Sequence, residues 1–522
     1  MNPPVSQESI LPLLAILASL AAVPAILLSG RRPNLREAWT FLAAFVKFAC
    51  VVALLPAALR GETTVCRLFE IAPGASFSLR ADPLGVYFAL VASGLWIVTA
   101  AYSIGYMRGH KEKKQTRFFA SFAMSLASTI GVAFAGDLLT FLIFYELLTL
   151  ATYPLVVHSE SKAAIRSGRM YLTYALTAGL LLLAGTAWIF FRTGTLEFAP
   201  GGFIPDGAFT AGEMKTLFML LMIGVAVKSG IMPLHSWLPA AMVAPTPVSA
   251  LLHAVAVVKS GAFGVLRVTG FVIGPEAMGT HGLDIILASF AGATILLASF
   301  IAMRQDNLKK RLAYSTVGHL SYIALGAALL TPAGLQGSLL HLSAHATMKI
   351  TLFFCAGAIA VHTHRTEISQ LNGLGRAMPW TFGAFAIGSL GLAGLPPING
   401  FVSKWWLSVG ALDSGKEIAL AIFLLSGALN AGYFFPIVIR AFFLPPDPAP
   451  EPSAHGHGHD DHHHHHPAPT REASPWMVVP LCTTAALALL LGLFPNFPLP
   501  FFELAAHVVE AVTGSIAPGA GQ

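Results

Sequence analysis

Five ionisable side chains lie inside long apolar runs of this sequence. They are Glu146, Lys228, Lys259, Lys349 and Lys404. A charge at the centre of a bilayer costs at least about 2.5–3.5 kcal/mol on insertion scales, so ionisable residues at that depth usually serve a function. Because amines and carboxylates bind and release protons, we expect a route for protons or cations.

Glu146 and Lys228 are expected to act as a pair. Burial disfavours the charged form of a lysine, and a nearby carboxylate favours it again. Movement of Glu146 toward or away from Lys228 would therefore load or unload a proton, which is the physical basis of a pump or an antiporter. The structural alternative is that Glu146 only holds helices together.

A second group of titratable residues follows a helical spacing. His341, His345 and Lys349 are four residues apart and would form one stripe, with about 6 Å between steps, that serves as a short relay. His253 and Lys259 are six residues apart, about 120° around a helix, so we favour Lys259 over His253 as part of the route.

Other polar residues in apolar surroundings are expected to have structural roles. Asp137 precedes an apolar run and is expected to cap a helix N-terminus. Lys47, Arg267 and Arg440 are expected to extend their long side chains to the membrane interface.

The composition indicates an all-α polytopic membrane protein. Of 522 residues, 55% are hydrophobic and only 11% are charged, and continuous apolar runs exclude a barrel. The runs predict about fourteen transmembrane helices, at 9–29, 39–59, 84–106, 116–135, 138–157, 170–192, 215–236, 244–272, 283–303, 314–331, 336–361, 380–409, 417–443 and 475–494. The stretch 501–514 is too short to span and predicts an interfacial helix.

Basic residues collect on alternate connections between these runs. Those after helices 1, 3, 5, 9, 11 and 13 hold most of them, whereas the other connections hold Arg60, Arg67, Arg80, Arg192, Lys215 and Lys416. The positive-inside rule then places the basic connections in the cytoplasm and both termini on the outer, periplasmic face of the inner (cell) membrane. The net charge of +6 thus reflects topology, and no nucleic-acid partner is expected.

Motifs for cofactors are missing from the sequence. Cys50, Cys66, Cys355 and Cys482 form no C-x-x-C pair, and neither a G-x-G-x-x-G after a strand nor a Walker A run occurs. We therefore expect no cofactor, no iron–sulfur cluster and no ATP drive.

One Pro- and His-rich segment, 444–474, interrupts the apolar pattern and predicts a cytoplasmic loop. Its histidines could bind Zn, Ni or Cu, but we favour a solvated loop without a metal. The histidines are His455, His457, His459 and His462 to His466.

Prolines interrupt two predicted helices close to buried lysines. Pro233 and Pro239 follow Lys228 in helix 7, and Pro396 and Pro397 precede Lys404 in helix 12. Broken helices in corresponding positions are typical of inverted repeats. We expect three N-terminal helices at 1–115 and two inverted five-helix repeats at 116–272 and 283–443. A last helix with an interfacial tail would follow at 475–522. The alternative is that the prolines only kink packed helices and that no repeat exists.

Three motifs carry a resemblance to a known family. KSGIMPLHSWLPAAMVAPTPVSALLHAVAVVKSG (228–261), RQDNLKKRLAYSTVGHLSYIALG (304–326) and GLPPINGFVSKWWL (394–407) resemble the antiporter-like subunits shared by respiratory complex I, membrane-bound hydrogenases and Mrp Na⁺/H⁺ antiporters, with the D-type Mrp protein the closest likeness. The resemblance implies a central proton axis at Glu146, Lys228, Lys259 with His253, His341 with His345, and Lys404.

The chain also departs from parts of the family pattern. It stops about 28 residues after the last predicted helix, whereas the distal complex I subunit continues into a long lateral helix. The middle complex I subunit tends to have Glu where this chain has Lys404, and the His-rich loop is outside the pattern.

We therefore expect a proton/cation translocating subunit that works with other membrane subunits, in the lipid bilayer, on H⁺ either alone or together with Na⁺ or K⁺. One alternative is a proton-pumping subunit of a complex I-like NADH:quinone oxidoreductase or a membrane-bound hydrogenase, the only case with a link to enzyme activity. The other is a coupling subunit for inorganic carbon uptake.

Overall fold

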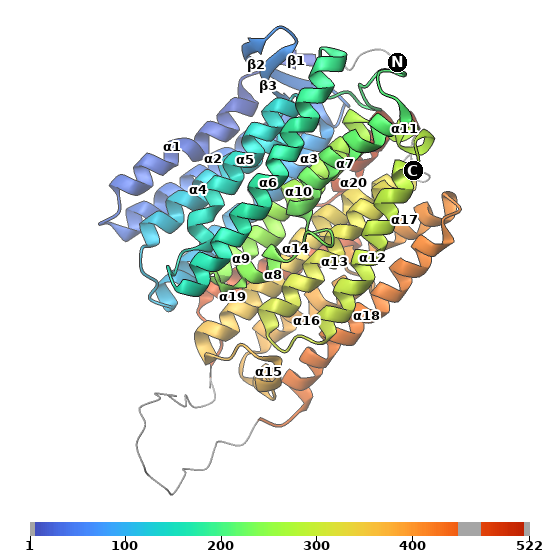
Figure 1. The fold of residues 1–522 in the computed structure, drawn as a ribbon. Helices are drawn as coiled ribbons and strands as arrows, with labels where there is room; N and C mark the ends of the chain where they lie inside the picture. Colours follow the sequence, from blue (N-terminus) through green and yellow to red (C-terminus); the bar gives the residue numbers. More distant parts are fainter. Residues whose placement is uncertain (1–5, 447–470, 516–522) are drawn as a thin grey trace, which may run out of the picture.

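The computed structural model describes residues 6–446 and 471–515, which form one bundle of long helices (Figure 1). The long helices are α1 (Leu11–Leu28), α2 (Pro33–Ala58), α3 (Pro83–Gly109), α4 (Gln115–Ala133), α5 (Leu138–Val156), α6 (Lys162–Thr193), α7 (Ala211–Ser229), α10 (Val257–Arg267), α12 (Leu283–Met303), α13 (Leu308–Ala327), α14 (Pro332–Thr363), α16 (Pro379–Ala393), α17 (Asn399–Asp413), α18 (Glu417–Phe443), α19 (Pro475–Leu493) and α20 (Phe501–Thr513). Short helices are α8 (Trp237–Ala240), α9 (Thr246–Ala250), α11 (Pro275–Thr280) and α15 (Leu374–Ala377).

The membrane character of the chain is confirmed by these helices. By length and composition, 10 of them in the described residues can cross a membrane, counting 246–272 as one. α4, α7, α13 and the α16–α17 pair occupy the remaining ranges predicted as spans, and they run beside the ten in the same bundle (Figure 1). The total of fourteen spans and the division into repeats stay predictions.

Two predicted helix interruptions are present. α7 ends at Ser229 and Gly230 follows with φ +69°, whereas α16 ends at Ala393 and Gly394 follows with φ +96°. Only glycine adopts these left-handed conformations at little cost, so each glycine terminates its helix. The confirmed breaks leave carbonyl groups at two helix ends inside the bundle.

A third irregularity, in predicted helix 8, was not expected. Between α9 and α10 the chain forms a π-helical segment, η2 (Leu251–Val255), and a second one, η3 (Val268–Val272), follows α10. The run SALLHAVAVV contains neither Pro nor Gly, so the sequence carries no breaker to predict it. Single π turns often occur at functional sites.

The prediction of an all-α fold missed a small sheet at one end of the bundle. Strands β1 (Ser6–Glu8), β2 (Thr63–Ala72) and β3 (Ala75–Ala81) form it, with β1 parallel and β3 antiparallel to β2. The hairpin turns at Pro73–Gly74, where Gly74 has φ +82°, as a type II turn requires. Strands β2 and β3 lie in the connection between α2 and α3, where the apolar runs predict no transmembrane element.

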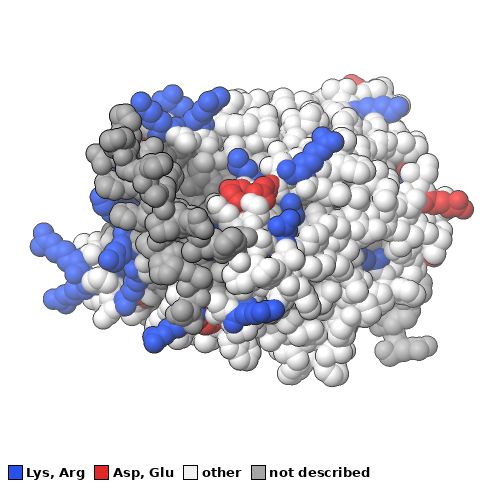
Figure 2. Space-filling view, turned by 90° about the horizontal axis from the view of Figure 1, so that it is seen from below, with Lys and Arg blue, Asp and Glu red and all other residues white. Residues whose placement is uncertain are grey.

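The basic connections gather at one end of the bundle. Figure 2, seen from below, shows Lys and Arg side chains on the face that includes the connections around α15. β1 and α20 lie at the opposite end (Figure 1), so the described chain begins and finishes on one side. An even number of spans requires this arrangement.

The structural roles assigned to four polar residues are partly confirmed. Asp137 caps α5 as predicted, since its side chain accepts from the Thr140 amide at 2.7 Å. Arg440 lies in the last turn of α18, as expected. Lys47 and Arg267 do not extend to an interface: Lys47 is fully buried in the middle of α2, and Arg267 is 2% exposed.

Arg267 instead forms a buried ion pair with Asp82, the residue that caps α3. Its Nη1 and Nη2 donate to the two Asp82 carboxylate oxygens at 2.5 and 2.7 Å. Phe198, Phe263 and Phe271 surround the guanidinium at 4.7–5.2 Å from their ring centroids. The pair therefore joins the start of α3 to the end of α10.

Replacing Asp82 by Asn should destabilise the fold because it leaves the buried Arg267 charge unpaired while keeping an N-capping oxygen. The expected loss is about 3–5 kcal/mol, since breaking a buried pair strands one charge. Thermal unfolding of the purified protein in detergent measures it. The double variant D82N/R267M should recover much of the loss, and additive losses in the two single variants would contradict the pair's role.

Candidate functional site

Glu146 of α5 and Lys228 of α7 face each other, as predicted. Lys228 Nζ and Glu146 Oε1 lie 3.8 Å apart, close enough for an ion pair but too far for a hydrogen bond. Neither Glu146 carboxylate oxygen has a hydrogen-bond partner within the described chain. The Lys228 amine donates instead to the Tyr145 carbonyl and lies 3.3 Å from the centroid of the Tyr145 ring. A small shift of the carboxylate would therefore make or break direct contact.

The two pair members differ in exposure. The Lys228 side chain is 0% exposed, whereas that of Glu146 is 24% exposed. Part of the Glu146 side chain thus lies at the surface of the chain, but both of its carboxylate oxygens are buried, as Lys228 is.

Two buried lysines lie at the ends of the broken helices. Lys404 Nζ donates to the carbonyls of Leu392 at 2.6 Å and Ala393 at 3.1 Å, which are the last residues of α16. Lys228 itself lies in the last turn of α7. The C-terminal end of a helix has unpaired carbonyls and a partial negative charge, so both sites favour an amine.

Lys259 of α10 contacts His345 of α14. Lys259 Nζ and His345 Nδ1 are 2.8 Å apart, and both side chains are fully buried. α10 also packs tightly on α7, because a Cβ at Gly261 would overlap the Ser229 amide nitrogen. This close approach brings the helix of Lys259 against the helix of Lys228.

His319 of α13 continues this row, although sequence reasoning did not select it. Its Nδ1 lies 3.1 Å from His341 Nε2 and its Nε2 lies 3.0 Å from Asn430 Oδ1. The His319 ring stacks 5.4 Å from that of His345, and His341 Nδ1 lies 2.9 Å from Ser403 Oγ. His319 was visible in the motif RLAYSTVGHLSYIALG, but a single histidine on a helix carries no spacing signal.

Two predicted site residues take other directions. Lys349 Nζ donates to the Leu312 carbonyl at 3.2 Å and lies 5.2 Å from the Phe434 ring centroid, so it points to α13. His253 lies on η2 with neither ring nitrogen hydrogen-bonded in the described residues, and its ring is 5.0 Å from that of Phe353. The structure therefore brings together seven residues, which we call the buried row: Glu146, Lys228, Lys259, His345, His319, His341 and Lys404.

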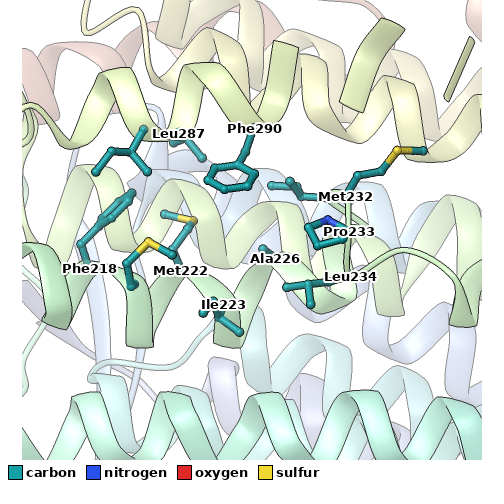
Figure 3. A pocket seen from close by; sticks show the side chains of 12 residues that line it. Phe218, Met222, Ile223, Ala226, Met232, Pro233, Leu234, Leu287 and Phe290 are labelled. Carbon is teal, nitrogen blue, oxygen red and sulfur yellow. The ribbon is translucent and has the colours of Figure 1, made fainter. Parts of the chain in front are cut away.

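An apolar cavity of about 240 Å³ lies beside the break of α7 (Figure 3). Its lining includes Met222, Ala226, Pro233, Leu287 and Phe290, from α7, the break and α12. The described lining side chains are apolar, so the cavity offers no polar group that could hold a water molecule for Lys228.

The histidines considered as metal ligands, His455, His457, His459 and His462, lie outside the described residues. Within residues 6–446 and 471–515, no three His, Cys, Asp or Glu side chains gather where they could hold a metal ion, and the four cysteines are free.

The chain matches two family profiles. The family described as NADH:quinone oxidoreductase/Mrp antiporter, TM, covers residues 135–430, and the one described as NADH-Ubiquinone oxidoreductase (complex I), chain 5 N-terminus, covers residues 72–119. The first match contains every residue of the buried row.

Individual proteins show the same likeness. The N-type membrane protein of the NADH-quinone oxidoreductase of Desulforudis audaxviator is 32% identical over 75% of this chain and 78% of its own. The D-type protein of the Na(+)/H(+) antiporter of Alkalihalophilus pseudofirmus is 29% identical over 70% of this chain and 73% of its own.

A chain of the Mrp complex from Dietzia sp. has the same fold, with a TM-score of 0.83, 24% identity and 98% of both chains covered. These matches show that the chain belongs to the NADH:quinone oxidoreductase/Mrp antiporter family of membrane subunits.

Proposed function

We propose that this chain is a proton- and cation-translocating subunit of a multisubunit membrane complex, equivalent to the D-type protein of Mrp Na⁺/H⁺ antiporters. The observation that carries the proposal is the buried row of titratable side chains, which runs from Glu146 near the surface of the chain to Lys404 on α17. Ionisable groups at this depth are costly to bury, and those that a membrane protein keeps usually mark a pathway for ions or protons.

Proton movement along the row would proceed in short steps. Lys259 and His345 are hydrogen-bonded, and His319 and His341 are too, with the rings of His345 and His319 stacked between the two pairs. The steps from Lys228 to Lys259 and from His341 to Lys404 have no direct contact, so water or side-chain movement must complete them. The step from Lys228 to Lys259 lies next to the loose contact of Glu146 with Lys228, so the charge state of that pair would control proton passage there.

A redox-driven complex is the second candidate function. The 32% identity to the N-type protein of an NADH-quinone oxidoreductase favours it as much as the 29% identity to the D-type antiporter protein favours the first. Mass spectrometry of the complex purified in mild detergent separates them: small hydrophobic partners indicate an antiporter, and Fe–S or flavin subunits indicate a redox pump.

We place the protein in the cell membrane with its basic end in the cytoplasm and both termini on the outer face. The face in Figure 2 has the excess of Lys and Arg that the positive-inside rule requires. Lipid would cover the exposed apolar side chains of the outer helices.

Glu146→Ala and Lys228→Ala should each abolish transport while the protein still inserts and assembles. The physical reason is that either change removes one partner of the charge switch. Proton flux in proteoliposomes that contain the whole complex measures this, with Glu197→Gln, a surface change, as the control. Full transport by either variant would overturn the switch.

Gly179→Ala should also slow transport, because a Cβ at Gly179 would lie 2.6 Å from Glu146 Oε1 and displace the carboxylate. A displacement of this size is expected to cost roughly ten- to hundred-fold in rate. Gly383→Ala is the matched control, since a Cβ there meets nothing within 4 Å. Equal rates for the two variants would show that the position of Glu146 is unimportant.

Cysteine labelling tests the orientation. In a background without the four native cysteines, Glu70→Cys on β2 should react with a membrane-impermeant thiol reagent in intact cells. Ser159→Cys, in the α5–α6 connection, should react only after the cells are permeabilised. The reverse pattern would place the basic end outside.

A further inference from the structure

Lys47 is a buried lysine outside the row. It lies near the middle of α2, so the rise of about 1.5 Å per residue places it about 21 Å from the start of the helix and about 16 Å from its end. Its side chain is 0% exposed. Its Nζ lies 4.5 Å from the centroid of the Trp96 ring, and neither Lys47 Nζ nor Trp96 Nε1 has a hydrogen-bond partner in the described chain.

The lack of an acceptor distinguishes Lys47 from the other buried lysines discussed above. Lys228, Lys349 and Lys404 donate to backbone carbonyls, and Lys259 contacts an imidazole nitrogen. No carboxylate in the part of the chain that the structure describes lies within ion-pair distance of Lys47.

Neighbouring elements offer no charge to compensate an ammonium at this position. α1 contains no ionisable side chain, and on α3 and α4 the only charged residues are Arg108 and Arg117 at the basic end. On α2 itself the nearest carboxylate, Glu37, is ten residues away, about 15 Å along the helix, and it pairs with Arg36 and Arg108.

The remaining titratable groups near α2 also leave Lys47 without a partner. Tyr87 and Tyr102 of α3 donate their hydroxyls to carbonyls of α14, and Tyr106 lies further along α3 toward the basic end. Arg67, Glu70 and Cys66 of β2 and Cys50 of α2 form no hydrogen bond or ion pair with Lys47 among the described residues.

The energies decide the charge state of Lys47 in this conformation. A cation–π contact contributes about 2 kcal/mol when desolvated. The desolvation penalty for a buried ion is several kcal/mol. These magnitudes favour the uncharged amine in this conformation, and a proton would be stabilised only where water or a rearrangement brings the amine an acceptor.

We propose that Lys47 is a second proton-binding site of this chain, separate from the buried row. The site has a physical connection to the row through α3. Trp96 lies on α3 between Tyr87 and Tyr102, whose hydroxyls donate to α14 carbonyls, those of Leu339 at 2.7 Å and Phe354 at 2.8 Å. Helix α3 therefore lies between Lys47 and the helix that holds His341 and His345.

Solid-state nitrogen NMR of the ¹⁵N-lysine-labelled complex in lipid bilayers tests this proposal without measuring transport. Subtracting the spectrum of Lys47→Met from that of the wild type isolates the Lys47 amine. We expect a neutral amine signal at alkaline pH that changes to an ammonium signal as the pH falls. Lys215→Met, at an exposed position, is the control and should give an ammonium signal throughout the neutral range.

Two outcomes would overturn the proposal: an ammonium signal at every pH, which means a permanent structural cation, or a neutral signal at every pH. If Lys47→Met does not assemble, Lys47→Arg removes the same lysine signal and serves for the subtraction. Because the signal reports proton occupancy of Lys47 alone, the result stands whether or not the row transports protons.

Discussion

The structure depends on how a membrane-embedded chain satisfies amines that water cannot reach. An amine at bilayer depth needs an acceptor, and water is not there to provide one. The break after α16 leaves a helix end inside the bundle, and Lys404 donates to the last carbonyls of that helix. Lys228, in the last turn of α7 at the other break, donates to the Tyr145 carbonyl of α5, and Lys349 donates to the Leu312 carbonyl of α13. Breaks, prolines and buried lysines are therefore parts of one arrangement.

Much of this arrangement could be predicted from the sequence. Apolar runs indicated the helices because a span needs about 20 apolar residues, and Pro233 and Pro396 indicated the breaks because proline cannot continue the hydrogen-bond pattern. Glu146 and Lys228 stood out because charges in such runs are rare. Their side chains lie 3.8 Å apart, so a small shift of the carboxylate makes or breaks direct contact with the amine, as a charge switch requires.

Other features could not be predicted because they depend on contacts between distant helices. His319 gains its place only from its neighbours on α14 and α18. Lys349 has the spacing of a relay residue, yet it turns toward α13. Lys47 and Arg267 resemble interfacial residues in the sequence, and only the packed bundle shows that both are buried.

Within the buried row, His319 contacts both His345 and His341 and so joins the Lys259–His345 pair to the half that contains His341 and Lys404. The most direct measurement is proton flux through the reconstituted complex with His319→Ala, which leaves the Glu146–Lys228 pair untouched. We predict at least about a tenfold loss of flux with normal assembly, equivalent to about 1.4 kcal/mol on the barrier. Flux at the wild-type rate would show that protons take a different path.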